Sequence, residues 1–220
     1  MKLSPAALFD LSHTLAAPLL ARFDYPWQAL PEIKAFIRAL GPTLSPDEYE
    51  QVGEEIWIAR SAKVAPTASI TGPCVIGPET EVRHGAFVRG SALVGAGAVV
   101  GNSVELKNVI LFDKVQVPHY NYVGDSILGF KAHMGAGSVT SNVKADRALM
   151  VVHTPEGNIE TGLKKFGAIL GDAAEIGCNA VLNPGSVVGP RSSVYPLTAV
   201  RGVVPPDCIC KATGVIVARE

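Results

Sequence analysis

Two basic residues, Arg89 and Lys107, are 18 residues apart, and each directly follows an aliphatic residue. If 18 residues make one turn of a coil, the two cations stack one above the other on the same side. Adjacent cations repel unless an anion lies between them, and phosphate fits, because arginine offers a fork of donors and lysine a point charge. Two solvated surface side chains would show the same spacing, so both interpretations stay open.

His119 follows in the segment from Val117 to Asp125. Histidine titrates near neutral pH and suits a general base that acts on an amine or a hydroxyl group. In the tripeptide 135–137, Gly-Ala-Gly, the small side chains leave backbone N–H groups uncovered, and these groups can bind a carbonyl oxygen. A tight corner of a coil would show the same tripeptide. Lys164 and Lys165 are a basic pair, either a solvated surface or a docking point for a carrier phosphate.

A six-residue period must position these side chains. Aliphatic residues recur without a miss at Ile58, Val64, Ile70, Ile76, Val82, Val88, Val94, Val100 and Leu106, and again at Leu170, Ile176, Leu182, Val188, Val194 and Val200. The residue four positions later is nearly always small, as at Cys74, which we interpret as core filler. Three such units close one coil whose short strands pair in parallel with the next coil. We therefore predict an all-β solenoid, a parallel β-helix of hexapeptide repeats.

The period slips in the region that contains His119. The steps from Leu106 to Leu111 and from Val123 to Leu128 are five residues long, and a shortened side changes the register between coils and can open a groove. Residues from about 141 to 166 leave the pattern and include a predicted hairpin, 149–152 with 158–161. A long excursion from a solenoid is more often functional than decorative.

The predicted organisation has three parts. Residues 1–55 lack the period and form a small N-terminal α-helical cap over one end of the coil, with helices at 6–17, at 26–40 and after Ser45-Pro46. Residues 56–205 form the β-helix. Residues 206–220 form a tail whose apolar stretch, 213–217, is a final strand.

Composition narrows the function classes. The formal net charge is −1, which argues against a general nucleic-acid or membrane-surface binder. The 4 cysteines form no C-x-x-C pair, and no apolar run is long enough to span a membrane. Asp10 and His13 interrupt any signal-peptide core. We therefore expect a cytoplasmic protein in a reducing compartment, with no nucleic-acid or membrane partner and no metal site.

These motifs together resemble a known family. The stretch 100–107 (VGNSVELK), the pattern His119-x-x-Tyr122-x-Gly124-Asp125, and the tripeptide 135–137 with Asn142 are similar to the glucosamine-1-phosphate acetyltransferase domain of the bifunctional sugar-1-phosphate nucleotidylyltransferases, the UDP-N-acetylglucosamine pyrophosphorylase family. The stretch 161–167 (TGLKKFG) followed by Gly171-Asp172 resembles the archaeal members especially. The resemblance covers about residues 57–205.

The resemblance implies a left-handed β-helix that forms a homotrimer, with acetyl-CoA bound between subunits. It implies that Arg89 and Lys107 hold the phosphate of an amino-sugar 1-phosphate, that His119 takes a proton from the sugar amine, and that Glu105 orients or polarises this base. It further implies contacts to the sugar from Tyr122 and Asn142, and to acetyl-CoA from Ala136 and Lys165. The freed amine would attack the thioester directly, without a covalent enzyme intermediate.

The chain departs from the family pattern at three contact positions. His133 stands where the bacterial domain has asparagine, among the substrate-binding residues, and Cys178 stands where it has serine, on the acetyl-CoA side. Val143 replaces a tyrosine. Fewer than about 60 residues precede the repeat and no glycine-rich phosphate loop is present, so we expect no nucleotidylyltransferase activity from this chain.

Two alternatives stay open. The departures would also suit a non-catalytic relative that binds the sugar phosphate and regulates. A zinc site is the other alternative, because some hexapeptide coils hold zinc with three histidines at a subunit boundary, and His84, His119 and His133 are available. Their spacings do not reproduce the closely spaced pair of that class.

Overall fold

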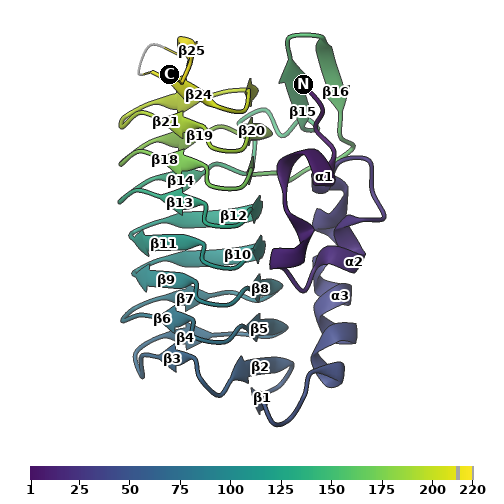
Figure 1. Cartoon of the computed structure of the whole chain (residues 1–220), viewed down its shortest axis with the longest axis vertical. Coiled ribbons are helices and arrows are strands. Elements are labelled where there is room, and N and C mark those ends of the chain that lie inside the picture. The colour runs from purple at the N-terminus through teal and green to yellow at the C-terminus, as the bar shows by residue number, and fades with distance from the viewer. Residues whose placement is uncertain (212–213, 220) are drawn as a thin grey trace.

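A computed structural model describes residues 1–211 and 214–219. The chain winds as a column of coils, and each regular coil contributes one short strand to each of three faces (Figure 1). Strands of successive coils pair in parallel, so the predicted fold class, the left-handed parallel β-helix of hexapeptide repeats, is confirmed.

The first face, which we call the site face, contains the start of two long strands and five short ones. Its strands are β4 (Ser69–Ile70), β7 (Phe87–Val88), the first part of β10 (Glu105–Leu111), the first part of β12 (Tyr122–Leu128), β14 (Val139–Thr140), β19 (Val181–Leu182) and β22 (Ala199–Val200).

The second face is covered by the N-terminal segment. Its strands are β2 (Ile56–Ala59), β5 (Cys74–Ile76), β8 (Ala92–Val94), the remainder of β10 and β12, β17 (Ala168–Leu170), β20 (Ser186–Val188) and β23 (Val203–Val204). An antiparallel strand, β1 (Tyr49–Gly53), pairs with β2.

The third face is a separate sheet. Its strands are β3 (Lys63–Val64), β6 (Glu81–Val82), β9 (Val99–Asn102), β11 (Gln116–His119), β13 (His133–Met134), β18 (Glu175–Ile176), β21 (Ser193–Val194), β24 (Cys208–Cys210) and β25 (Ile216–Ala218). Strand β25 pairs antiparallel with β24, within the predicted tail, and Thr213 of that prediction lies outside the described residues.

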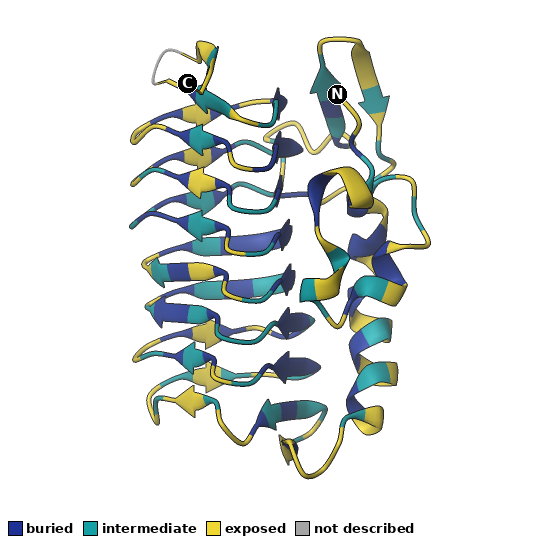
Figure 2. Cartoon of the chain, viewed as in Figure 1, coloured by how far each residue is buried: buried dark blue, intermediate teal, exposed yellow. Residues whose placement is uncertain are grey.

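The repeat fills the core as the period predicts. From Ile76 to Val200, the six-residue aliphatic positions are at most 3% exposed, and their small partners from Cys74 to Thr198 are at most 1% exposed. Figure 2 shows buried segments, in dark blue, in coil after coil. Cys74 is fully buried, and burial raises the pKa of its thiol to about 12, as expected for core filler. At the N-terminal end of the coil the pattern is looser, and Val64 is exposed.

The five-residue steps change one edge of the coil. Strands β10 and β12 run without interruption from the site face onto the second face, because their corners contain one residue fewer than the corner at Arg89. The left-handed backbone conformation at Asn108 (φ +56°) and Asp125 (φ +48°) makes this tight corner. Asp125 consequently lies above Asn108 in the next coil.

The predicted cap over one end of the coil is wrong. The helices instead lie alongside it, against the second face, where α3 contacts β8 and β10 (Figure 1). They are α1 (Pro5–Leu8), α2 (Ala17–Leu20) and α3 (Ile33–Leu40), with short 3-10 helices η1 (Leu11–His13), η2 (Pro26–Glu32) and η3 (Gly41–Thr43).

Two of the helix predictions were also wrong, whereas residues 26–40 are helical throughout, as η2 followed by α3. Asp10 accepts hydrogen bonds from the Ser12 backbone and donates its own N–H to Asp172 of the coil, which ends the first helix early. Pro31 confines the second element to a 3-10 turn up to Glu32. The predicted third helix is a turn followed by β1, because Tyr49 pairs with Ala59 in the first coil.

The excursion contains the predicted hairpin, formed by β15 (Val151–Thr154) and β16 (Gly157–Glu160). It stands beside the upper coils near the N-terminus (Figure 1). Met150 and Val152 are fully buried, so its base is anchored in the core.

Candidate active site

Two edges of the coil border the site face, and the predicted site residues divide between them. We call the first the cation edge. The strand registers stack its residues one per coil: Arg89, Lys107, Gly124, Ser141, Asn183 and Arg201. The stacking of Arg89 beneath Lys107 is therefore as the 18-residue spacing predicted, and Arg89 N–H donates to the carbonyl of Leu106 at 2.8 Å.

The second border, which we call the histidine edge, is built by backbone hydrogen bonds between corners. Tyr120 N–H donates to Asn102 (2.9 Å), Gly137 N–H to His119 (3.0 Å), Asn179 N–H to Ala136 (2.9 Å) and Leu197 N–H to Cys178 (3.0 Å). His119, Ala136 and Cys178 thus lie on one edge in successive coils. His119 is an exposed residue, so its imidazole is accessible to a ligand.

Glu105 and Tyr122 lie between the edges, directly above one another in the register of the site face. Gly124, the residue above Lys107, is five positions after His119, so the strip between the edges is at most about 17 Å wide at the backbone. A ligand of sugar-phosphate size lying on this strip can reach both a cation and the imidazole.

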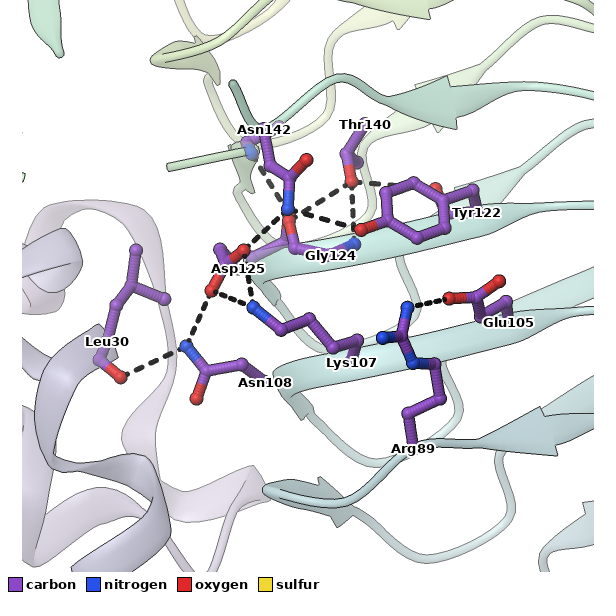
Figure 3. A network of polar contacts seen from close by, with 12 residues as sticks. Leu30, Arg89, Glu105, Lys107, Asn108, Tyr122, Gly124, Asp125, Thr140 and Asn142 are labelled. Atoms are coloured by element: carbon purple, nitrogen blue, oxygen red, sulfur yellow. Dashed lines mark hydrogen bonds and ion pairs between the residues drawn. The ribbon is translucent and has the colours of Figure 1, made fainter. Parts of the chain in front are cut away.

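Asp125 gathers the polar side chains of the cation edge. Its side chain is 5% exposed, and its carboxylate accepts from Lys107 Nζ (3.1 Å to each oxygen), Asn108 Nδ2 (2.9 Å) and Asn142 Nδ2 (2.5 Å) (Figure 3). Asn142 also donates to the Tyr122 hydroxyl at 3.1 Å. Lys107, Tyr122 and Asn142 therefore form one connected network.

Arg89 and Lys107 each have a carboxylate partner. Arg89 Nη1 lies 2.6 Å from Glu105 Oε1, on the half-exposed surface of the site face. The predicted orientation of His119 by Glu105 is not what the contacts show, because Glu105 is bound to Arg89 and no described contact joins it to the imidazole. A phosphate arriving here would compete with Glu105 for the guanidinium group.

The environment of Tyr122 keeps its hydroxyl neutral. Partial burial raises the pKa of Tyr122, and the nearby Asp125 carboxylate raises it further. Gly124 is required beside this ring, since a Cβ atom there would collide with the Tyr122 hydroxyl and ring. The phenol ring of Tyr122 therefore lies beside Gly124, the residue above Lys107 that has no side chain.

Two residues that build the site were not singled out from the sequence. Asn121 is buried in the coil, where its Oδ1 accepts from the His119 N–H (3.1 Å) and its Nδ2 donates to the Gly135 carbonyl (2.8 Å). It fixes the backbone of the histidine edge from inside. Asn108 links Asp125 to the Leu30 carbonyl (3.2 Å) in the N-terminal segment (Figure 3).

The predicted acetyl-CoA contacts do not all lie together. Ala136 and Cys178 share the histidine edge, whereas Lys165 is exposed near the cation edge, where Phe166 N–H donates to the Asn142 carbonyl (3.1 Å). The Gly135 and Gly137 N–H groups bond to Ile176 and His119, so they are not uncovered as predicted. Within the described residues, Ala136 is the member of this tripeptide whose N–H has no acceptor in the chain.

His133 is not part of this network. Its Nδ1 lies 2.8 Å from Glu175 Oε2 on the third face. His84 is bound to the Thr67 hydroxyl (2.7 Å), one coil below Asn102 on the histidine edge. Over residues 1–211 and 214–219, no three metal-binding side chains of one chain gather, and no helix is long and apolar enough to cross a membrane.

Residues 70–194 match the protein family described as the GMPPB C-terminal domain, and the chain belongs to that family. The chain is 30% identical to the uncharacterized acetyltransferase YaiX of Escherichia coli O6:K15:H31, over 70% of this chain and 71% of YaiX. It is 33% identical to the bifunctional protein GlmU of Methanococcus maripaludis, over 50% of this chain and 26% of GlmU, so the match spans about a quarter of that relative.

A solved structure of a hexapeptide transferase family protein from Anaplasma phagocytophilum also aligns with the chain. The TM-score is 0.42 at 18% identity, over 74% of this chain and 78% of that one.

Proposed function

We propose that the protein is an acyltransferase that moves an acetyl group from acetyl-CoA to the amine of an amino-sugar 1-phosphate. The observation that carries this proposal is the placement of two cations and an exposed imidazole on opposite borders of one narrow strip, with Glu105 and Tyr122 between them. The family membership and the similarity to a protein named as an acetyltransferase support the same reaction class.

Arg89 and Lys107 bind the phosphate in this proposal. Charge-assisted hydrogen bonds from a guanidinium and an ammonium group suit a phosphate dianion. Asp125 is the partner that holds Lys107 in place, and Glu105 is the partner that Arg89 exchanges, wholly or in part, for the phosphate. Tyr122 and Asn142 position the sugar ring through the network they share.

His119 acts as the general base. An amine attacks a thioester only when it carries a free electron pair, so the imidazole takes one proton from the sugar amine. The nitrogen bonds to the carbonyl carbon, the carbon–sulfur bond breaks, and the thiolate of CoA leaves, taking up the second proton that the nitrogen releases as the amide forms. The Ala136 N–H, which lies one coil above His119 and has no acceptor within the described residues, donates to the thioester oxygen in this proposal.

The thioester of acetyl-CoA is proposed to lie at the histidine edge, between two copies of the chain. His133 lies on the third face, outside the site face of its own chain, so the sugar contact that the resemblance implies for it would be made to a sugar bound by a neighbouring copy. This placement supports the homotrimer.

The test mixes purified protein with acetyl-CoA and glucosamine 1-phosphate and follows the release of free thiol. We expect turnover, and we expect Arg89→Met and Lys107→Met to raise KM for the sugar phosphate by about 10- to 100-fold, since each removes a charged hydrogen bond. Arg191→Met is the matched control, because Arg191 is an exposed arginine paired with Asp207 away from the site face.

Absence of turnover with any amino-sugar phosphate, in a folded oligomer, would contradict the proposal. Phosphate binding without turnover would favour the non-catalytic alternative.

A further inference from the structure

A cleft of about 680 Å³ lies between the excursion and the upper coils, on the same edge as Arg89 and Lys107. Its wall includes Val143 and Lys144 from the start of the excursion, His153 from the hairpin, and Asn183 and Arg201 from the cation edge. The volume is in the range of small-molecule sites. The proposed acyl transfer assigns no role to any of these five residues.

The hairpin approaches the coil closely at this cleft. Arg201 Nη2 lies 3.2 Å from His153 Nε2, and His153 Nδ1 lies 2.8 Å from Asn158 Oδ1. Because the amide oxygen accepts, Nδ1 carries the proton, and Nε2 is left to accept from the guanidinium group. Gly202 permits this approach, since a Cβ atom there would lie 2.7 Å from the His153 carbonyl oxygen.

The cleft has an excess of positive charge. Arg201 has no carboxylate partner anywhere in residues 1–211 or 214–219. Lys144 Nζ donates to the Leu149 carbonyl at 2.8 Å, which holds the ammonium group in the wall without neutralising it. Asp146 is the acidic residue of the lining, and its Oδ1 accepts from Ala148 N–H at 3.0 Å.

The distance from Lys107 indicates how long a ligand spanning both places must be. Arg201 lies four coils above Lys107 on the cation edge, through Gly124, Ser141 and Asn183. At the spacing of paired strands this is about 19 Å. A sugar monophosphate is shorter than this separation, whereas a nucleotide joined to a sugar or to a pantetheine arm is long enough.

We propose that this cleft binds the phosphate-bearing nucleotide end of a ligand whose other end lies on the site face. Arg201 and Lys144 contact phosphate oxygens, the exposed side chain of Val143 packs against the base, and Asp146 accepts from ribose hydroxyl groups. Two sources share this chemistry, namely a nucleoside-diphosphate amino sugar and CoA with its 3′-phosphate. The proposal extends the proposed function, but its test measures binding and needs no turnover.

The experiment measures dissociation constants calorimetrically for four probes: glucosamine 1-phosphate, UDP-glucosamine, CoA and dephospho-CoA. The proteins are the wild type, Arg201→Met, Lys144→Met and the control Arg191→Met, each checked for an unchanged thermal unfolding midpoint. We expect Arg201→Met to weaken at least one nucleotide probe by about 10- to 100-fold, the value of a charged hydrogen bond, and to leave glucosamine 1-phosphate unchanged. Lys144→Met is expected to act in the same direction.

The probes identify the source. Weakening of UDP-glucosamine alone assigns the cleft to a nucleotide-linked substrate. Weakening of CoA but not of dephospho-CoA assigns it to the 3′-phosphate of the acetyl carrier. The proposal is overturned if the wild type binds no nucleotide probe, or if both variants bind all four probes as the wild type does. If the acyl-transfer assay fails but nucleotide binding is intact and depends on Arg201, the proposed function is rejected and the nucleotide-binding proposal stands.

Discussion

Asp125 is a nearly buried carboxylate that depends on three nitrogen donors, of which Lys107 carries the only compensating charge in direct contact within the described residues. We expect Lys107→Met to lower the free energy of unfolding by about 2 kcal/mol, because it leaves a buried charge unpaired. Urea denaturation measures this change. The double variant with Asp125→Asn should recover part of the loss, since the charge is then gone. Equal destabilisation in both backgrounds would show that the ion pair contributes nothing.

His119 carries the proposed proton transfer. We expect His119→Gln to lower kcat by about 100- to 10,000-fold while KM for the sugar phosphate stays within about twofold, because the cations that bind it are unchanged. Steady-state thiol release measures both constants. His84→Gln is the control, since His84 lies on the same edge two coils below and contacts Thr67. A kcat for His119→Gln equal to that of the control would remove His119 from the mechanism.

At this scale the sequence predicted the stacking of the two cations, and it singled out the exposed His119, but it did not show which residues support them. Coil spacing placed Arg89 beneath Lys107, and the same 18-residue step from Lys107 leads to Asp125, which could have been recognised as its partner. The bond of Glu105 to Arg89 could not have been recognised from the sequence. A glutamate at that position is compatible both with orienting His119, as the resemblance implies, and with an ion pair to Arg89. Asn121 gave no signal, since its inward orientation depends on the left-handed corner at Tyr120.

The hairpin approaches the coil closely at two glycines, Gly185 and Gly202, and the closer approach is at Gly202, whose φ of +80° also favours glycine. We expect Gly202→Ala to push β15 away and to increase amide hydrogen exchange in Val151–Thr154 by about tenfold or more, as local opening becomes easier. Gly162→Ala is the matched control, because Gly162 has a φ of +70° and a Cβ atom at that position would meet no other atom within 4 Å. Equal exchange in the two variants would mean that backbone strain, and not the close approach, controls the hairpin.

Among the elements, strands were predictable and the N-terminal segment was not. The six-residue period fixes which side of each strand is buried, so the coil follows from local sequence alone. The helices depend on remote partners: Asp10 bonds to Asp172, and Trp27 packs against Phe166 with ring centroids 5.7 Å apart. No local sequence pattern shows such long-range contacts. The N-terminal segment was therefore predicted to cover one end of the coil, whereas it covers the second face.

Across the whole molecule, the histidine edge carries large apolar residues that the single chain leaves exposed to solvent. Leu197 is 76% exposed and Tyr120 is 64% exposed, and both hold left-handed backbone conformations that are costly for such residues. We expect sedimentation equilibrium to give three times the chain mass, and we expect Leu197→Glu to shift the population toward single chains, because it places a charge in the proposed seam.

Val52→Glu is the control for this measurement, since Val52 is 55% exposed in β1, far along the chain from the histidine edge. A monomeric wild type would contradict the trimer, and dissociation by both variants would show a nonspecific effect of charge.

The N-terminal segment touches the coil at many levels, from β8 and β10 at α3 to Asp113 at His13 and Asp172 at Asp10. In a bare solenoid each repeat contacts only its neighbours, so the ends fray and the stack melts in stages. Here the N-terminal segment contacts several repeats at once, so partial unfolding of any of these repeats would also release that segment. We therefore expect a single all-or-none transition, in which the middle coils that hold the candidate site unfold together with the other described coils.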